Sequence, residues 1–356
     1  MERLPLPVDT GARLDGVDAV LDGFFSVAKR RAASLGSEYV ELWTVLERST
    51  AGGKHFRPRL VLAVYEALGG ADHRAASRVG AAFELLHAAL LVHDDVIDRD
   101  FFRRGIPNVS GSYRDSATTA GIPTPIAEHR GRSAAIIAGD LALAGASRLF
   151  DALECQDGVR ARLRDIFDEA IFESAGGEML DVELSLSEEM PTVENILRVG
   201  RAKTAVYSFE APLQSGAVLA HASDAVVRAL GDFGRELGVA YQVVDDLLGV
   251  FGSEHLTGKS TLSDLREGKR TVLVAHAATT NAWFSIKPFI GKSDLNEREA
   301  EHVRGRLEIC GARAFAEGLV QEHARRARAV LDRPMIDTAL RDAVNPMIDA
   351  VLDRAR

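Results

Sequence analysis

The chain has 356 residues, of which 46% are hydrophobic, and it carries a formal net charge of −9. This length and apolar content suffice for a large buried core, and we expect a single domain over residues 1–356. The acidic balance argues against a nucleic-acid-binding protein, which would present a basic surface. Cys155 and Cys310 are far apart and lack CxxC spacing, so neither a disulfide framework nor a zinc site is expected.

The N-terminal segment lacks the basic region and apolar stretch of a signal peptide. We also expect no apolar segment long enough to span a bilayer. These two features predict a cytoplasmic protein.

The first elements are two helices, over Leu14–Ser34 and Tyr39–Leu46, where apolar residues recur at helical spacing. The segment Gly52–Pro58 follows and reads Gly-Gly-Lys-His-Phe-Arg-Pro. It places Lys54 and Arg57 at the start of the next helix, where basic side chains and backbone N–H groups both favour anions. The segment is a candidate phosphate site, although a solvated basic helix start would show the same pattern.

A long apolar helix is expected over Ala71–Asp98, and it ends in acidic residues. Asp94 and Asp98 lie one helical turn apart on one face, with Asp95 beside them. Carboxylates this close raise one another's pKa unless a cation neutralises them. Mg²⁺ fits, because it takes oxygen ligands and binds through one or two carboxylates plus substrate phosphates. A helix end with solvated acids is the alternative.

Basic and aromatic groups surround this acidic segment. His87 lies two turns before Asp94 on a similar face and could reach a ligand in the same cavity, although a histidine satisfied in the core is the alternative. The adjacent guanidiniums of Arg103 and Arg104 indicate an anion between them, or else a basic loop that balances the acids. Arg104–Arg132 is rich in Gly, Pro, Ser and Thr, so we expect a long loop or lid.

Further helices are expected over Ser133–Leu153, Gly158–Leu186 and Pro191–Gly200, and another opens at Lys203. The run Phe233–Phe251 is again apolar and carries the acidic pair Asp245 and Asp246. Two such helices facing each other across a cavity would suit a substrate with an apolar tail and a diphosphate head bridged by metal ions.

The polar segment Gly252–Arg270 follows the second acidic pair and contains Lys259, Asp264 and Lys269. Its Thr-Gly-Lys-Ser sequence is not a P-loop, because the distal glycine is missing and the segment follows a helix instead of a strand. The rest of the chain, Thr271–Arg356, has helical periodicity. No run of alternating strands occurs, so the predicted fold is all-α.

Taken in order, these motifs resemble those of the trans-prenyl diphosphate synthases, or polyprenyl synthetases. The similarity covers about Gly52–Leu273. Its pieces occur in the family's order, as Gly52–Pro58, His87, Asp94–Asp98, Arg103-Arg104-Gly, Gly139-Asp140, Lys203-Thr204, Gln242 before Asp245-Asp246, and Lys259, Asp264 and Lys269. Four of the seven lysines fall on these positions, which a set of solvated surface lysines would not predict.

The resemblance implies a large helical bundle around a central cavity, normally a homodimer, that condenses isopentenyl diphosphate with an allylic diphosphate. It implies about three Mg²⁺ ions, held by Asp94, Asp95, Asp98, Asp245, Asp246 and Asp264. The residues implied to contact the allylic diphosphate are Arg103, Lys203, Lys259 and Lys269. Those implied to hold isopentenyl diphosphate are Lys54, Arg57, His87 and Arg104, with Thr204 and Gln242 between the two substrates.

Product length is expected to depend on the residues before Asp94, because a chain growing away from the metal ions must run down this helix. Five residues of helix rise about 7 to 8 Å, so Ala89 and Leu90 should lie beside the first isoprene units, with Leu86 one turn further. In the family, aromatic side chains at the first two positions stop growth at fifteen carbons. Neither is aromatic here, so we expect geranylgeranyl diphosphate (C20), ahead of longer polyprenyl and farnesyl products.

The chain departs from the family's pattern at two places. The first is His55-Phe56, where the family more usually has a basic and a short residue, and the second is Gly249. Gly249 occupies the position of a common third acid in the second motif. Because Asp245 and Asp246 alone could hold the metal, we expect Gly249→Asp to leave activity within a small factor.

Three other interpretations are open. A class I terpene cyclase shares the fold and one acidic motif, but it needs no isopentenyl diphosphate site, so Lys54, Arg57 and His87 argue against it. A His-Asp metal-dependent phosphohydrolase could use His93, but it would need further histidine ligands. A non-catalytic subunit that modulates a partner synthase is supported only by Gly249.

Overall fold

The structure is a computed structural model that describes residues 11–50, 55–103, 105–252 and 262–354. The chain divides into two compact units. Among the described residues, the N-terminal unit extends to Asp165 and includes Ser215–Ala222, and the C-terminal unit comprises Ile166–Gln214 and the residues from Ser223 onward. The boundaries fall within helices α7 and α9. A single domain over the whole chain therefore stays a prediction.

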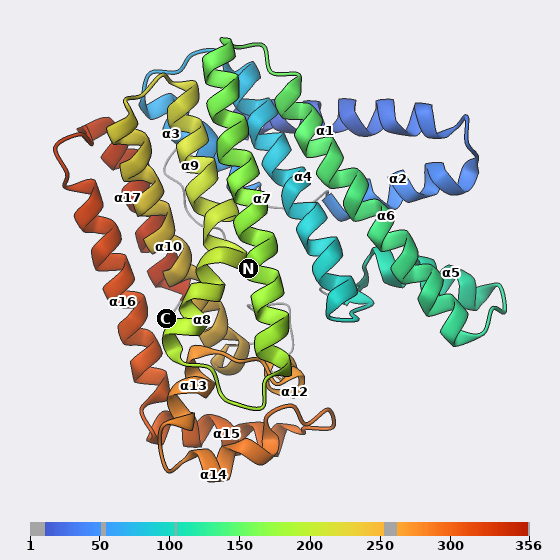
Figure 1. The fold of residues 1–356 in the computed structure, drawn as a ribbon, viewed down its shortest axis with the longest axis vertical. Coiled ribbons are helices and arrows are strands. Elements are labelled where there is room, and N and C mark those ends of the chain that lie inside the picture. The colour runs from blue at the N-terminus through green and yellow to red at the C-terminus, as the bar shows by residue number, and fades with distance from the viewer. Residues whose placement is uncertain (1–10, 51–54, 104, 253–261, 355–356) are drawn as a thin grey trace. The chain divides into compact units, whose positions relative to one another are not determined.

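Almost all regular structure in the described residues is helical, which confirms the all-α class (Figure 1). The N-terminal unit contains α1 (Gly11–Ala32), α2 (Ser37–Thr50), α3 (Phe56–Ala67), α4 (His73–Ile97), β1 (Phe102–Arg103), β2 (Ile106–Pro107), α5 (Val109–Thr119), α6 (Thr124–Asp151) and the first part of α7 (Asp157–Leu186). The strands β1 and β2 form an antiparallel pair with Arg103 opposite Ile106.

The C-terminal unit contains the rest of α7 and most of the later helices. These are α8 (Val193–Gly200), the π-helix η1 (Arg201–Glu210), α9 (Ala211–Leu219), α10 (Asp224–Phe251), α12 (Ser263–Glu267), α13 (Val272–Ala278), α14 (Trp283–Ile286), the 3₁₀ turn η2 (Lys287–Phe289), α15 (Glu297–Ile309), α16 (Ala312–Leu331) and α17 (Thr338–Arg354).

Helix α4 is the central element of the N-terminal unit. Asp72 caps it by accepting a hydrogen bond from the N–H of Arg74, which satisfies one of the free donors of the first turn. Its apolar side chains are largely buried against α1, α3 and α6. This packing fixes the position of the carboxyl end of α4, where the first acids lie.

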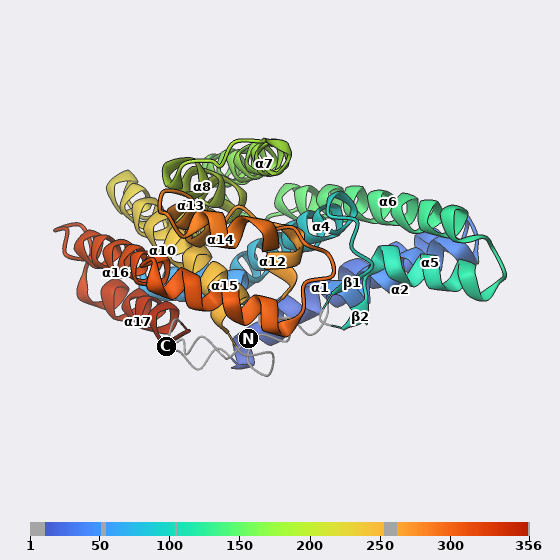
Figure 2. The same cartoon turned by 90° about the horizontal axis from the view of Figure 1, so that it is seen from below.

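Helix α10 has the same role in the C-terminal unit. Ser223 caps its first turn by accepting from the N–H of Val226, and its apolar face is buried against η1, α16 and α17. Figure 1 shows α10, α16 and α17 running side by side, and Figure 2 shows α15 beside α16. The second acidic pair lies in the last two turns of α10.

The prediction of a long loop or lid over Arg104–Arg132 is wrong. After the β1–β2 hairpin the chain forms α5 and then enters α6 at Thr124. The side chain of Asn108 caps α5 by accepting from the N–H of Gly111, and α5 packs along α6. Tertiary packing and this cap stabilise a helix that Gly, Ser and Thr would not favour by propensity alone.

A π-helical segment, η1, carries Lys203 and Thr204. Single π turns inside helices occur frequently at functional sites. The π geometry ends at Ala211, just before Pro212, which has no N–H to donate to the preceding turn. The helix predicted to open at Lys203 is therefore present, but its π geometry was not predicted.

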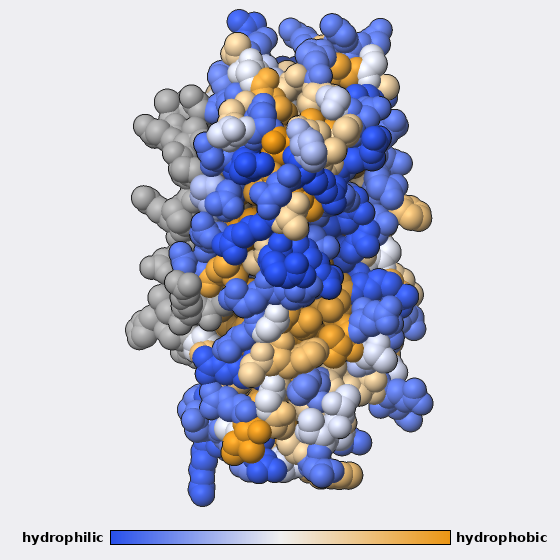
Figure 3. Space-filling view, turned by 90° about the vertical axis from the view of Figure 1, so that its left-hand side faces the viewer, coloured by the Kyte–Doolittle hydropathy of each residue, from blue (hydrophilic) through white to orange (hydrophobic). Residues whose placement is uncertain are grey.

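Two helices among the described residues, α4 and α6, are long and apolar enough by length and composition alone to cross a membrane, a test that core helices also pass, so neither is a clear membrane span. In α4, 72% of the apolar window is buried inside the structure, as in a core helix, and in α6 the buried share is 50%. On the face shown in Figure 3, which carries α16 and α17, hydrophilic side chains predominate.

Candidate active site

The first acidic cluster lies at the carboxyl end of α4 and consists of Asp94, Asp95 and Asp98. Asp95 is buried, Asp94 is half-buried and Asp98 is exposed at the helix end. Arg103 donates to Asp95 Oδ1 from Nε at 3.0 Å and from Nη2 at 2.6 Å, and its Nη2 lies 3.2 Å from Asp94 Oδ2. Burial raises the pKa of Asp95, although Arg103 opposes this. A guanidinium therefore already acts as counter-ion to this cluster.

His93, which precedes the cluster, packs on the Gly139-Asp140 motif of α6. Its Nε2 lies 3.4 Å from Asp140 Oδ1. A Cβ atom added at Gly139 would come within 2.2 Å of the same nitrogen, so only glycine gives the imidazole this room. The Gly-Asp pair thus positions the residue next to Asp94.

Of the residues assigned to isopentenyl diphosphate, Arg57 and His87 are described and both belong to the N-terminal unit. Arg57 is buried in the first turn of α3, and His87 is half-buried on α4. Lys54 and Arg104 lie outside the described residues, as does Lys259, which was assigned to the allylic diphosphate.

His55 has a structural role that the sequence did not reveal. Its backbone is left-handed, with φ 45°, and it immediately precedes α3. Its Nε2 lies 3.0 Å from Asp18 Oδ1 of α1, and its Nδ1 lies 3.5 Å from Glu84 Oε2 of α4. Interaction with Glu84, the largest contribution, raises the pKa of His55 in spite of burial. The ring therefore ties the start of α3 to two neighbouring helices.

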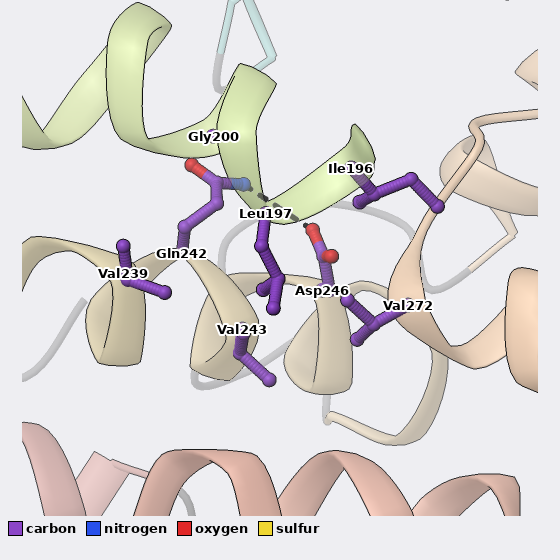
Figure 4. Close-up of a pocket in the computed structure, with 8 residues that line it drawn as sticks. All are labelled: Ile196, Leu197, Gly200, Val239, Gln242, Val243, Asp246 and Val272. Carbon is purple, nitrogen blue, oxygen red and sulfur yellow. Dashed lines mark hydrogen bonds between the residues drawn. The ribbon is translucent and has the colours of Figure 1, made fainter. Parts of the chain in front are cut away.

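The second acidic cluster consists of Asp245 and Asp246 on α10 with Asp264 on α12. Gln242 Nε2 donates to Asp246 Oδ1 at 3.2 Å (Figure 4), and Lys269 Nζ donates to Asp264 Oδ1 at 3.0 Å. Burial raises the pKa of Asp246 to about 7, and the charges of Asp264 and Asp245 add to this effect. The cluster therefore stores repulsion that a cation would relieve.

Asp245, by contrast, has a counter-ion from the end of the chain. Arg354, in the last turn of α17, donates from Nη2 to Asp245 Oδ1 at 2.6 Å. No local sequence pattern predicts this contact, because the two residues are separated by 109 positions.

Gly249 is explained by its contact with Asp264. A Cβ atom added at Gly249 would lie 1.8 Å from Asp264 Oδ2, far inside any permitted separation. The carboxylate of Asp264 therefore occupies the space that a side chain at position 249 would need. A side chain at position 249 therefore requires the Asp264 carboxylate to move, and the effect of Gly249→Asp on activity stays a prediction.

A small pocket adjoins the second cluster, as Figure 4 shows. Its walls come from α8, α10 and the start of α13. Most of its lining is apolar, and the lining residues are Ile196, Leu197, Gly200, Val239, Gln242, Val243, Asp246 and Val272. Apolar side chains thus reach up to an acidic carboxylate and an amide within the C-terminal unit.

Lys203 and Thr204 are both half-buried on η1. The Nζ of Lys203 lies 2.8 Å from Asp181 Oδ2 and 3.0 Å from Glu178 Oε2, both on α7. Neither acid was predicted from the sequence as a site residue, although their spacing of three places them on one helical face. Both acids hold the ammonium group of Lys203 beside α7.

The residues assigned to product length lie on α4. Leu86 and Ala89 are buried and Leu90 is half-buried. Their burial shows that a larger side chain at position 89 must displace its neighbours. Their contact with a growing prenyl chain stays a prediction.

Both acidic clusters suit Mg²⁺ in their chemistry. Their aspartates supply oxygen donors, and Asp246 has only an amide as its hydrogen-bond partner in Figure 4. Over the described parts of the chain, no group of three or more His, Cys, Asp or Glu side chains is arranged to hold a metal ion. Mg²⁺ needs no such cage, because it usually keeps several waters and binds through one or two carboxylates plus substrate phosphates.

Known proteins resemble this chain in both sequence and fold. Residues 40–305 match the polyprenyl synthetase family. The geranylfarnesyl diphosphate synthase of Aeropyrum pernix is 31% identical over 313 residues, which cover 86% of this chain and 92% of that protein. The geranylgeranyl diphosphate synthase of Mycobacterium tuberculosis is 33% identical, covering 81% of this chain and 78% of that protein.

A solved structure extends the similarity over nearly the whole chain. It is the geranylgeranyl pyrophosphate synthase from Corynebacterium glutamicum complexed with isoprenyl diphosphate and magnesium, with a TM-score of 0.90 and 29% identity, covering 98% of this chain and 100% of that chain. The family match spans well over half of the sequence and contains both acidic motifs. The chain therefore belongs to the polyprenyl synthetase family and is a trans-prenyltransferase.

Proposed function

We propose that this enzyme condenses isopentenyl diphosphate with an allylic diphosphate to give a trans-prenyl diphosphate, with geranylgeranyl diphosphate as its main product. The observation that supports this best is the crowding of Asp245, Asp246 and Asp264. The pKa of Asp246 is raised by burial and, to a smaller extent, by the charges of Asp264 and Asp245, and a cation beside these carboxylates would favour their charged forms. The relative from Corynebacterium glutamicum, which is described with isoprenyl diphosphate and magnesium, is consistent with such a cation.

The proposed metal ligands are the aspartates of both clusters, which would act on one allylic diphosphate. We propose about three Mg²⁺ ions, since each needs only one or two carboxylates beside phosphate oxygens. The ligands are Asp94, Asp95 and Asp98 on α4, Asp245 and Asp246 on α10, and Asp264 on α12. Bound magnesium would stabilise the negative charge on the leaving diphosphate as a Lewis acid.

Basic residues would hold the two diphosphates. For the allylic substrate we propose Arg103, Lys203, Lys259 and Lys269. For isopentenyl diphosphate we propose Lys54, Arg57, His87 and Arg104. This proposal is supported by the ion pairs that Arg103, Lys203 and Lys269 make with neighbouring acids, because such pairs keep the basic side chains charged and oriented.

The reaction breaks the C–O bond of the allylic diphosphate, which leaves an allylic cation and free diphosphate. Arg103, Lys203 and Lys269 stabilise the negative charge that grows on the leaving group. Apolar walls exclude water, which would quench the cation, and hold the double bond of isopentenyl diphosphate for attack. Thr204 and Gln242 lie between the substrates in this account. Attack of this double bond on the allylic cation forms the new C–C bond, and loss of a proton to the departing diphosphate completes a product that is one isoprene unit longer.

The test is mass analysis of products from isopentenyl diphosphate and Mg²⁺ with dimethylallyl, geranyl, farnesyl or geranylgeranyl diphosphate as primer. We expect a C20 product from the first three primers and little extension of the fourth. Products that stop at C15, or that extend well beyond C20, would show that the condensation is right and the length is wrong. No product from folded protein with any primer would contradict the proposed function.

We further propose that the enzyme is a cytoplasmic homodimer. Within the N-terminal unit, Ile136 and Ile137 of α6 are 47% and 49% exposed, and within the C-terminal unit Phe172 and Met179 of α7 are 74% and 57% exposed. Exposed apolar side chains that recur along helices favour a partner surface, here a second copy. Light scattering should give twice the chain mass, and Ile136→Asp should shift it toward the monomer.

A further inference from the structure

The contact between Arg354 and Asp245 has no role in the proposed chemistry. The side chain of Arg354 is only 11% exposed, whereas that of Asp245 is 43% exposed. Its guanidinium also lies over the ring of Tyr241, with Cζ 4.4 Å from the ring centroid. Tyr241 and Asp245 are four residues apart on α10, so one helical face offers both a ring and a carboxylate to the same cation.

One terminal nitrogen of the Arg354 guanidinium makes a hydrogen bond and the other can still donate one. Its Nη2 donates to Asp245, while its buried Nη1 has no hydrogen-bond partner among the residues that the structure describes. Since Arg354 ends α17, its positive charge is also favourable to the helix dipole. These contacts place a permanent cation at the outer acid of the second cluster.

The three acids of this cluster have different partners. Asp245 has the guanidinium of Arg354, Asp264 has the ammonium of Lys269, and Asp246 has the amide of Gln242. A divalent cation that approaches Asp245 meets a positive charge at hydrogen-bonding distance from the same carboxylate. Like charges so close repel, so the two cations compete for Asp245.

We infer that Arg354 is the counter-ion of Asp245 in the metal-free enzyme and that Mg²⁺ must displace it, an inference that rests on the proposed function because it takes Asp245 as a metal ligand. The C-terminal helix thereby sets the metal affinity of the second cluster. It keeps the acidic face stable before metal and substrate arrive. A displaced guanidinium, with two free donor groups, is then available to an anion.

The test measures Mn²⁺ binding to the full-length enzyme without substrate, from the electron paramagnetic resonance signal of the free ion. Removing the competing charge in Arg354→Gln should tighten binding at one site by about fivefold. Without metal, Arg354→Gln should also have a lower Tm than the wild type. Mn²⁺ should raise the Tm of this variant by more than it raises the Tm of the wild type. Unchanged or weaker Mn²⁺ binding in this variant would overturn the inference.

Arg328→Gln is the matched control, because Arg328 pairs with Asp349 of α17 at the same 2.6 Å but is exposed. It should leave Mn²⁺ binding unchanged. If Arg354→Gln does not fold, Arg354→Lys replaces it, because lysine keeps the positive charge but lacks the planar guanidinium. We expect Arg354→Lys to bind Mn²⁺ more tightly than the wild type, by a smaller factor than Arg354→Gln. Equal or weaker binding would contradict the inference.

Asp245→Asn distinguishes the assignment of Asp245 as a metal ligand from the role of Arg354. If it abolishes binding at one site while Arg354→Gln changes nothing, the metal assignment stands and the role of Arg354 is wrong. If Asp245→Asn changes nothing, the metal assignment itself fails.

Discussion

The two acidic clusters look alike in sequence but differ in how their charge is balanced. On α4 the arginine comes from the adjacent hairpin and contacts the buried acid, since Arg103 donates twice to Asp95. On α10 the arginine comes from the last helix and contacts the outer acid, Asp245, while the inner Asp246 accepts a hydrogen bond from Gln242. Burial raises the pKa of the inner acid in both clusters, to about 7 for Asp246. Equal motifs therefore do not imply equal surroundings, because an arginine contacts the inner acid in the first cluster and the outer acid in the second.

Loss of one acid from either cluster gives the largest effect that we expect. Asp94→Asn and Asp245→Asn should each lower kcat by at least about 10²-fold, because each removes an oxygen donor from the group that stabilises the leaving diphosphate. Steady-state assays at saturating Mg²⁺ measure this. Asp232→Asn, on α10 but paired with Arg333, is the control and should keep wild-type turnover. Full activity in folded Asp94→Asn or Asp245→Asn would remove that cluster from the reaction.

A side chain at Gly249 should damage only the second cluster. Gly249→Asp and Gly249→Ala should each lower kcat by about tenfold or more, because the new Cβ displaces the carboxylate of Asp264. The double variant Gly249→Asp with Asp264→Gly should be more active than Gly249→Asp alone, since it removes the clash and returns an acid. Unchanged or higher turnover in Gly249→Asp would instead support the simpler expectation from sequence.

Aromatic residues before the first cluster should change the product and not the rate of ionisation. Leu90→Phe and Ala89→Phe should shift the product to C15 or shorter, because both positions lie within about 8 Å of the acids along α4. Ala89 is buried, so Leu90→Phe is the safer variant for folding. Mass analysis gives the distribution, with Leu91→Phe as the control on another face of the helix. An unchanged distribution in both variants would contradict the proposed path of the chain.

The smallest effect concerns His55, which touches neither cluster. It faces Asp18 of α1 and Glu84 of α4, with Arg59 of α3 opposing them. Its pKa is raised in the folded protein, so protonated His55 stabilises the fold below the usual pKa of 6.5, and this stability is lost as pH rises through the folded-state pKa. His55→Gln should therefore lower the free energy of unfolding at pH 6 by about 1 kcal/mol or less and have little effect at pH 9. Denaturant unfolding measures this, with exposed His129→Gln as control; a loss that is equal at both pH values would contradict it.

The sequence predicted the local features of this enzyme well. The helical periodicity of α4 and α10 and the placement of Asp94, Asp95, Asp245 and Asp246 at their ends are confirmed. Such features depend on neighbours within a few turns, which periodicity and capping residues report directly.

Features that depend on distant contacts were missed. Helix α5 was predicted as a loop, because its composition is weak and its stability comes from packing on α6. Arg354 meets Asp245 from 109 positions away, and Asp264 fills the space beside Gly249 from another helix. No local pattern encodes these contacts, and they are the ones that distinguish the two clusters.

Binding of a farnesyl diphosphate analogue with a non-ionising thiolo linkage tests most directly whether both clusters serve one diphosphate. Calorimetry with Mg²⁺ should show that Asp94→Asn and Asp245→Asn each weaken its binding by about tenfold or more, while Asp232→Asn binds as the wild type does. Wild-type affinity in either cluster variant would contradict the account, because that cluster would then hold no part of the allylic diphosphate.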